Sequence, residues 1–337
     1  MVIPELTPRR ERILRHVIRE YVALAQPVAS DLIARKYESD LSPATVRNEM
    51  SALEEAGLIA QPHTSAGRVP TDRGYRYFVE WFMGQNRDLE LAEQRAIRQQ
   101  FHQLAHSGNE AAHLASALLA RTLHSAGVAT PPSSTNARIR RIELVPLEDD
   151  LVLVTLLLQS GNVRQVVQRV SADQVLSRED LTRLSNELSD KLADKTAGQV
   201  RRAMRLLSDA ARPFASAVAR LLQQAQDQAF AAVYLEGLAQ LLNQPEFAQS
   251  SKLRPILEVL EHQPMLARFL AESLAAPGVQ VIIGAENRLE QMREASLVLT
   301  RYGSPDELGG VLGIVGPTRL PYWRAVPIVR FIAELMG

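Results

Sequence analysis

One segment, Leu41 to Tyr77, constrains the fold of this chain more than any other, because it contains a complete series of helix and hairpin signals. Ser42 is a favourable N-cap residue and Pro43 suits the first helical position, so a helix is expected to begin at Pro43. Gly57 supplies a left-handed stop after this helix. The apolar stripe of the helix consists of Val46, Met50 and Leu53.

The opposite side of this helix has small or hydrogen-bonding side chains, concentrated in its N-terminal half: Ser42, Ala44, Thr45, Arg47, Asn48 and Ser51. A recognition helix contacts base edges with its N-terminal residues. Arginine suits guanine, asparagine suits adenine, and an alanine or threonine methyl suits the thymine methyl. The sequence therefore predicts a DNA-contacting helix, with the acidic pair Glu54 and Glu55 at its far end, away from phosphate.

A short hairpin is expected after this helix. Leu58 to Gln61 forms one strand, Pro62 to Gly67 a polar tip, and Arg68 to Pro70 the returning strand, which together are typical of a wing. The side chains expected to meet a DNA backbone or minor groove are His63, Thr64, Ser65 and Arg68. Thr71 caps a further helix, whose Arg73 and Arg76 lie opposite its apolar residues and are predicted to share one face with Arg47 and Arg68.

Two earlier helices complete a helix-turn-helix. Thr7 caps the first, with Pro8 following, and Ser30 is predicted to cap the second. Winged helices also serve as protein-docking or RNA-binding modules, and exposed arginine or asparagine side chains are often merely solvated. Residues 1–85 contain equal numbers of basic and acidic side chains, so attraction to DNA must come from their arrangement. This balance favours a dimer that doubles the contacts.

The run SPATVRNEMSALEEAGLIAQPHTSAGRVPTDRGYRYFV resembles the N-terminal signature of the HrcA family of bacterial heat-inducible transcription repressors. Gly278 to Asn287 (GVQVIIGAEN) and Gly313 to Tyr322 (GIVGPTRLPY) are also similar to that family. The resemblance extends from about residue 7 to the C-terminus. It implies a homodimer that binds double-stranded DNA at an inverted repeat, the CIRCE element, upstream of chaperone operons, and whose activity depends on the GroE chaperonin.

Composition excludes several classes of protein. The 337 residues include no cysteine, which excludes disulfides and thiolate metal sites, and no apolar run approaches the length of a membrane span. The N-terminus lacks the apolar region of a signal peptide, so we expect a cytoplasmic protein. No phosphate-binding loop, hydrolase or metalloprotease motif is present. We therefore expect neither an enzyme nor a cofactor.

The remainder of the chain predicts an α+β multidomain protein. Gln85 to His106 is interpreted as a connecting helix, and the histidines within and after it as solvated or packed rather than metal ligands. A second helix covers Asn109 to Ser125. Strands are expected at 138–146, 151–158, 163–170, 279–283, 296–302 and 310–315, and a final helix at 321–336.

The strands form two groups that are separated by a helical block, about Glu187 to Leu253, as expected for an inserted domain. The family is similar in this respect, since it has a GAF-like domain interrupted by an inserted dimerisation domain. The predicted domains are a winged helix-turn-helix (1–84), a linker (85–107), a GAF-like domain in two parts (108–186 and 254–337) and the mainly helical insert (187–253). The insert has more apolar surface than so small a block can bury alone, which favours a partner subunit; the alternative is that it packs on its own chain.

Two other functions remain open. A small molecule in the GAF-like domain could switch DNA affinity, or the winged helix could serve only as a protein-interaction module. Regulation by chaperonin has a physical basis, because a split domain must close over a long insertion before its late strands can pair. Such a chain is a plausible chaperonin client.

Overall fold

The computed structural model describes residues 5–63, 66–83, 89–105, 107–132, 137–148, 150–159, 161–170, 176–229, 233–247, 250–274, 276–303 and 309–337. The chain divides into two compact units. The main unit contains residues 1–130, 233–302 and 311–336, and the inserted unit contains residues 131–232 with a short return at 303–310. Each unit has its own buried core.

The main unit begins with a winged helix-turn-helix. Its elements are α1 (Pro8–Leu24), α2 (Ser30–Lys36), α3 (Pro43–Glu55), β1 (Ile59–Ala60), β2 (Val69–Pro70) and α4 (Asp72–Met83). The Thr7 hydroxyl accepts a hydrogen bond from the Arg10 amide, and Pro8 occupies the first turn, so the predicted start of α1 is confirmed. Ser30 is instead the first helical residue of α2, and Ala29 occupies the cap without a side-chain hydrogen bond.

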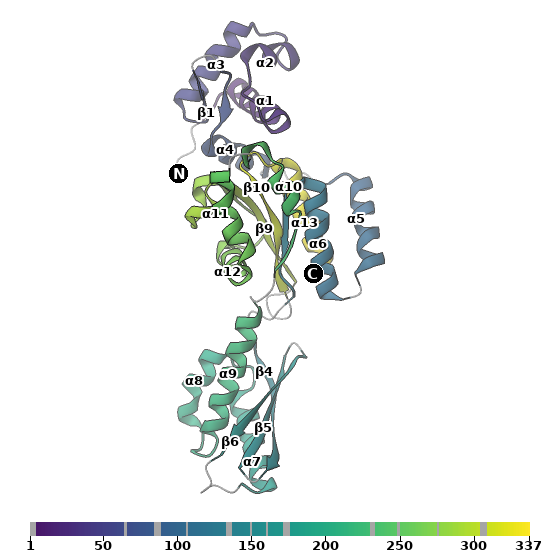
Figure 1. Ribbon diagram of the computed structural model, residues 1–337, viewed down its shortest axis with the longest axis vertical. Helices are drawn as coiled ribbons and strands as arrows, with labels where there is room; N and C mark the ends of the chain where they lie inside the picture. The colour runs from purple at the N-terminus through teal and green to yellow at the C-terminus, as the bar shows by residue number, and fades with distance from the viewer. Residues whose placement is uncertain are drawn as a thin grey trace. The chain divides into compact units, whose positions relative to one another are not determined.

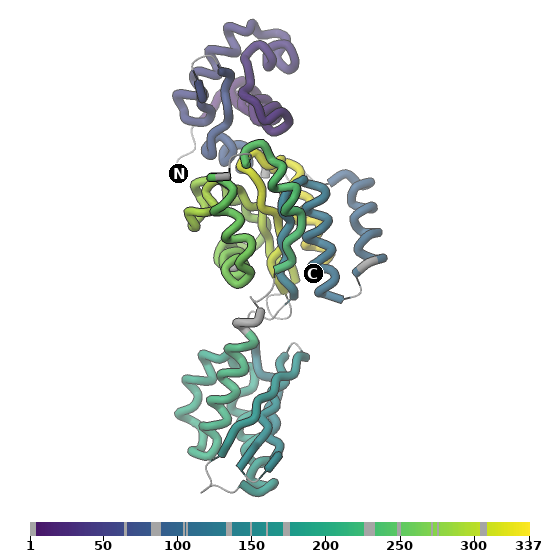
Figure 2. Tube along the Cα trace, in the orientation of Figure 1, coloured from purple at the N-terminus to yellow at the C-terminus, as the bar shows by residue number. Residues whose placement is uncertain are grey.

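A five-stranded sheet forms the centre of the main unit, in the order β7-β3-β10-β9-β8. The strands are β3 (Ala126–Ala129), β7 (Tyr234–Glu236), β8 (Gln280–Ile283), β9 (Ala295–Gly303) and β10 (Gly309–Pro317). β3 pairs antiparallel with both β7 and β10, so one early strand lies between two late ones, as the colours of Figure 2 show. The three late strands were predicted, whereas β3 and β7 were not.

Helices cover both faces of this central sheet. α6 (Gly108–Leu123) and α13 (Tyr322–Met336) lie on one face, and α11 (Ser250–Glu261) and α12 (Gln263–Ser273) lie on the other (Figure 1). The central strands are accordingly buried along almost their whole length. The short elements around the sheet are α10 (Leu238–Leu242), η2 (Pro245–Phe247), η3 (Gly284–Glu286) and η4 (Glu290–Met292).

The predicted connecting helix is observed as α5 (Leu91–Leu104). Its residues Ile97 and Phe101 are buried, and the helix packs against α6 and α13. It is therefore part of the main unit rather than a free linker. Within the described part of the chain, no helix is long and apolar enough to cross a membrane.

The inserted unit contains a three-stranded antiparallel sheet, β4 (Ile139–Glu148), β5 (Leu151–Leu158) and β6 (Val163–Arg169). The β5–β6 hairpin was predicted, and its turn residue Gly161 has a φ of 83°. One face of the sheet is covered by α7 (Arg178–Leu192) and α9 (Arg212–Ala229), while α8 (Ala197–Ala203) packs on α9 and the short η1 (Met204–Leu206) precedes α9.

The domain boundaries differ from the predicted ones. The strands β4, β5 and β6 belong to the inserted unit, so this unit begins near residue 131 rather than 187, and it ends at 232 rather than 253. The physical reason is that the apolar side chains of the helical block pack on these strands: Leu207, Phe214, Val218, Leu221 and Leu222 are all buried in one core with β4 and β5. The block therefore buries most of its apolar surface within its own chain.

Candidate nucleic-acid interface

The start of α3 is fixed by its cap. The Ser42 hydroxyl accepts a hydrogen bond from the Thr45 amide at 3.1 Å, as an N-cap residue does, and Pro43 follows at the first helical position. The helix ends where Gly57 adopts a φ of 71°. Both features were predicted. The inward stripe is almost fully buried, with 0–2% exposure, and consists of Val46, Met50 and Leu53.

The outer side of α3 presents the predicted polar residues to solvent. Ala44, Arg47 and Asn48 are exposed, together with the cap residue Ser42. Thr45 is half-buried, and its hydroxyl lies 2.9 Å from that of Ser42. The half-buried Ser51 donates its hydroxyl to the Arg47 carbonyl at 3.1 Å, so its hydrogen atom is used within the helix. Arg47 and Asn48 are thus the long polar side chains best placed to reach a ligand.

The wing is a two-stranded hairpin extended by the chain before α2. β1 and β2 pair antiparallel, and Val28 and Arg68 exchange two backbone hydrogen bonds of 2.8 and 2.9 Å. His63 at the tip is exposed. Thr64 and Ser65, which were also predicted to contact DNA, lie outside the described residues. The Val28 bridge holds the wing beside the turn that precedes α2.

Arg68 connects the wing to the end of α3. Its Nε donates to a Glu54 carboxylate oxygen at 2.8 Å, while the other oxygen accepts from the Gln61 amide at 3.0 Å. The Arg68 side chain is only 17% exposed. The expectation that Glu54 merely points away from the contact surface is therefore incomplete, because this carboxylate neutralises the wing arginine and fixes the wing against α3.

A polar groove of about 410 Å³ lies between α3, the wing and the start of α2. Arg47 and Arg68 are among its lining residues, together with Gln61 and Ser30. Its other lining residues are apolar or glycine, and those from the wing, Ala66 and Gly67, are small. The groove therefore joins the two predicted contact elements, the outer side of α3 and the wing.

The two arginines of α4 have different surroundings. Arg73 is half-buried, and a Cβ atom placed on Gly57 would lie 3.6 Å from its Nη1 atom, so it stays close to the end of α3. Arg76 forms an ion pair with Glu286 and donates to the Val281 carbonyl at 2.6 Å. The prediction that Arg76 shares a face with Arg47 and Arg68 is wrong, because its guanidinium is held by the central sheet region of the main unit.

A buried acid fixes α1 against α2. Glu20 is 4% exposed, accepts from Lys36 Nζ at 2.7 Å and also bonds the Tyr37 hydroxyl. Burial opposes ionisation of this carboxyl, but the hydrogen bonds from Lys36 and Tyr37 outweigh it and lower its pKa. The helix-turn-helix therefore contains an ionised carboxylate at neutral pH.

The histidines do not form a metal site in the described residues, where no group of three potential ligands occurs. His102 is exposed on α5, and His106 lies outside the described residues. His113 instead lies 2.9 Å from a carboxylate oxygen of Glu236, next to the ring of Tyr234.

The capped helix α3, its exposed polar side and the adjoining wing define a winged-helix DNA-binding protein. Two family models match the chain. One is described as "Winged helix-turn-helix transcription repressor, HrcA DNA-binding" and covers residues 5–80, and the other is described as "HrcA protein C terminal domain" and covers residues 109–326. The chain belongs to the HrcA family of heat-inducible transcription repressors.

Relatives match over nearly the full length. A protein named "Heat-inducible transcription repressor HrcA" from Roseiflexus castenholzii is 41% identical over 341 residues, which cover 99% of this chain and 94% of the relative. A protein of the same name from Herpetosiphon aurantiacus is also 41% identical, with 99% and 95% covered. A solved structure titled only as a hypothetical protein shares the fold, with a TM-score of 0.63, 23% identity and 98% of both chains covered.

Proposed function

We propose that this chain represses heat-shock operons by binding, as a homodimer, an inverted repeat of the CIRCE type. In this proposal each protomer places α3 in the major groove of one half-site. The observation that carries it is the exposure of Arg47 and Asn48 at the capped end of α3, opposite a fully buried stripe. Ser42, Ala44, Thr45 and Ser51 complete the base-facing side, and His63, Arg68 and Arg73 face the DNA backbone.

The dimer interface in this proposal is the outer face of the β4-β5-β6 sheet. The inner face is covered by α7 and α9, whereas the outer face presents Val145, Leu153 and Val167 in one cross-strand row. Leu157 and Val163 form a second paired position, whose row ends in the exposed Arg141 of β4. Val145, Val163 and Val167 are 45–55% exposed, which is unusual for three valines on one sheet face.

A second copy of this chain is the occupant that best fits this face. One protomer provides one α3 and so covers one half of an inverted repeat, whose symmetry requires a two-fold related partner. In an interface formed across a two-fold axis, the apolar side chains of this face are buried in both protomers. The row between these two positions is polar and contains Glu143, Thr155 and Gln165. Gln165 donates to Thr155 at 3.2 Å, and this polar row favours a single register of the two sheets.

Dependence on the GroE chaperonin is the third part of the proposal. The central sheet is assembled from β3, which precedes the inserted unit, and from four strands that follow it. Until those late strands form, the apolar strand β3 and helix α6 lack their partners, which supports slow folding through an aggregation-prone state. Heat would occupy the chaperonin with other unfolded proteins, so less repressor would reach its active form. We retain a GAF-like interpretation of this two-sided α/β region.

The test is binding of the purified protein to labelled duplexes from the chaperone promoters of its own organism, with and without added chaperonin. We expect refolded protein to bind weakly, and chaperonin to raise the active fraction without remaining in the DNA complex. Equal yield and rate of active protein with and without chaperonin after heating would contradict this dependence. Binding that responds to a small molecule but not to chaperonin would favour a ligand sensor, and failure to bind any duplex at low salt would favour a protein-docking module.

A further inference from the structure

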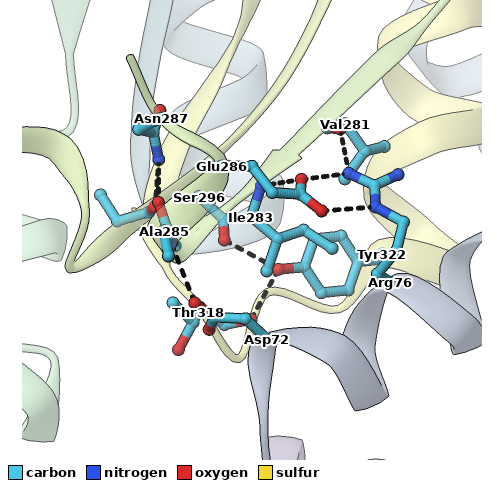
Figure 3. Close-up of polar contacts among 12 residues, drawn as sticks. Asp72, Arg76, Val281, Ile283, Ala285, Glu286, Asn287, Ser296, Thr318 and Tyr322 are labelled. Atoms are coloured by element: carbon cyan, nitrogen blue, oxygen red, sulfur yellow. Dashed lines mark hydrogen bonds and ion pairs between the residues drawn. The ribbon is translucent and has the colours of Figure 1, made fainter. Parts of the chain in front are cut away.

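Two of the sequence motifs, 278–287 and 313–322, have no part in the contact surface described above. Each includes the end of a strand of the central sheet and the segment after it, where β8 leads into η3 and β10 leads into α13. Figure 3 shows that side chains of α4 lie directly against these two segments. We call this contact region, between α4 and the segments 281–287 and 317–323, the joint.

One side of the joint is polar, and its contacts come from one turn of α4. Asp72 accepts a hydrogen bond from the Ala285 amide at 2.9 Å, and Arg76, four residues later, binds Glu286 and the Val281 carbonyl (Figure 3). Glu286 is held in turn by the Ile283 amide at 2.9 Å. The hydrogen bond to Glu286 raises the pKa of the Arg76 guanidinium, so Arg76 stays charged.

The approach of Asp72 depends on a glycine. Gly284 has a φ of 49°, and a Cβ atom at this position would lie 2.1 Å from the Asp72 carboxylate oxygen. Any other residue would push the carboxylate away from the Ala285 amide. The loop therefore has a local conformation that fits the end of α4.

The centre of the joint is aromatic and buried. Tyr75 of α4 packs on Tyr322 with ring centroids 5.7 Å apart, and both side chains are at most 1% exposed. The Tyr322 hydroxyl donates to the Thr318 carbonyl at 2.6 Å and lies 2.9 Å from the Ser296 hydroxyl. The rings of Phe78 and Trp323 pack edge to face, with their centroids 5.8 Å apart. Packing of this kind resembles a protein core more than a flexible hinge.

A second arginine, Arg319, binds the winged helix at α1 rather than at α4. Arg319 donates to the Val22 carbonyl near the end of α1 at 3.0 Å. The same guanidinium binds Gln244 at 2.6 Å and forms an ion pair with Glu246, and its side chain is only 14% exposed. The winged helix is thus held through α1 and α4 at once, which restricts rotation as well as translation.

We infer that the joint makes Asp72, Arg76 and Arg319 positioning residues, which fix the direction of α3 relative to the central sheet and so restrict the half-site spacings that a dimer accepts. This inference rests on the proposed function, because spacing has meaning only for two linked recognition helices. A rigid attachment keeps α3 in one orientation on the central sheet and so leaves fewer positions along the duplex for the second α3, whereas a loose attachment reaches more positions with lower effective concentration at each.

The experiment compares wild type with the double variant Asp72→Asn/Arg76→Ala. Affinity is measured for a single half-site and for inverted repeats whose spacer is varied one base pair at a time. Wild type should prefer one spacer sharply. The variant should lose about tenfold of that discrimination, while half-site affinity stays within about twofold, because α3 itself is unchanged. Arg268→Ala, which removes an exposed arginine paired with Glu272 on α12, is the matched control and should retain the wild-type profile.

A spacer profile in the variant that matches wild type would overturn the inference. Arg76→Lys, which keeps the charge but loses the two-pronged contact with Glu286, provides a milder variant and should flatten the profile partially. If wild type binds no inverted repeat, the proposed function fails, and a second measurement tests the joint by itself. In a Trp81→Phe background Trp323 is the remaining tryptophan, so its emission reports the contact with Phe78.

In that background the double variant should increase quenching of Trp323 by acrylamide about twofold, as expected for a ring transferred from packed surroundings to water. The Arg268→Ala control should leave quenching unchanged. Unchanged quenching in the double variant would show that these polar contacts do not hold the joint, and the inference would be wrong irrespective of DNA binding.

Discussion

Two surfaces of this protein are uncovered in opposite ways: the outer side of α3 and the outer side of the β4-β5-β6 sheet. Both belong to elements whose inner sides are buried. The α3 surface is polar, with Arg47 and Asn48 in solvent, whereas the sheet surface is apolar, with Val163 and Val167 about half exposed. A polar surface can exchange water for DNA reversibly, but an apolar one favours permanent cover. Substitutions on the α3 surface should therefore change the affinity for DNA, and substitutions on the sheet surface should change the oligomeric state.

The largest effect is expected on the inner side of α3. Met50→Asp places an unpaired charge among residues that are at most 2% exposed, and it should destabilise the winged helix by about 3 kcal/mol or more. Urea denaturation followed by circular dichroism measures this. Arg47→Ala, three residues earlier on the outer side, is the control and should unfold as wild type does. A Met50→Asp protein with wild-type stability would mean that the two sides of α3 are assigned the wrong way round.

The sheet surface is tested by Leu153→Asp/Val167→Asp, which places two carboxylates in one cross-strand row. Sedimentation should show a monomer, and operator affinity should fall about 100-fold because the second half-site contact is no longer intramolecular. Arg202→Asp, at an exposed position of α8 in the same unit, is the matched control and should stay dimeric. A dimer that persists in the double variant would place the interface elsewhere.

On the outer side of α3, Arg47→Ala and Asn48→Ala should each weaken specific binding by about 1–3 kcal/mol, because each removes a base contact and leaves the fold intact. Gel-shift titration against operator and scrambled duplexes measures the loss. Glu55→Ala, exposed at the far end of the same helix, is the control. Operator affinity that is unchanged in both variants would exclude α3 as the recognition helix.

The wing differs from the outer side of α3, because its basic residue Arg68 is already paired with Glu54. Arg68→Ala should weaken binding to all sequences alike by about 1 kcal/mol and flatten the salt dependence by about one counterion. Glu54→Gln removes the competing carboxylate and should have the opposite effect on the salt dependence. A change of sequence preference at constant salt slope would mean instead that the wing contacts bases.

The smallest effect is confined to acid. The pKa of Glu20 is lower in the folded protein than in the unfolded chain, so its contribution to stability is present above its ordinary pKa and is lost as pH falls through the folded value. Thermal unfolding measured from neutral to acid pH should show this loss in wild type. Glu20→Gln should reduce the dependence, whereas Glu55→Gln, an exposed carboxyl, should not. If Glu20→Gln lost thermal stability in acid to the same extent as wild type, the loss would be due to other carboxylates.

Local signals in the sequence were sufficient where a structure depends on neighbouring residues. The cap at Ser42, the stop at Gly57 and the apolar run 151–158 all predicted elements that are observed within a residue or two. Contacts between distant segments could not be predicted in this way. The partner of Arg76 lies 210 residues further along the chain, and the apolar pattern of β5 does not indicate which helices cover it. β3 and β7 were missed because they are short, and β7 lies within the block whose apolar residues were interpreted as helical.

The joint has a consequence for synthesis on the ribosome. The winged helix is translated first, and its internal contacts need little beyond residue 83, but Glu286, Arg319 and Tyr322 are made more than 200 residues later. A chain released early would therefore carry a folded recognition helix with nothing to aim it. Because the last strands and α13 supply the anchor, the cell obtains a correctly aimed repressor only from chains that were translated to the end.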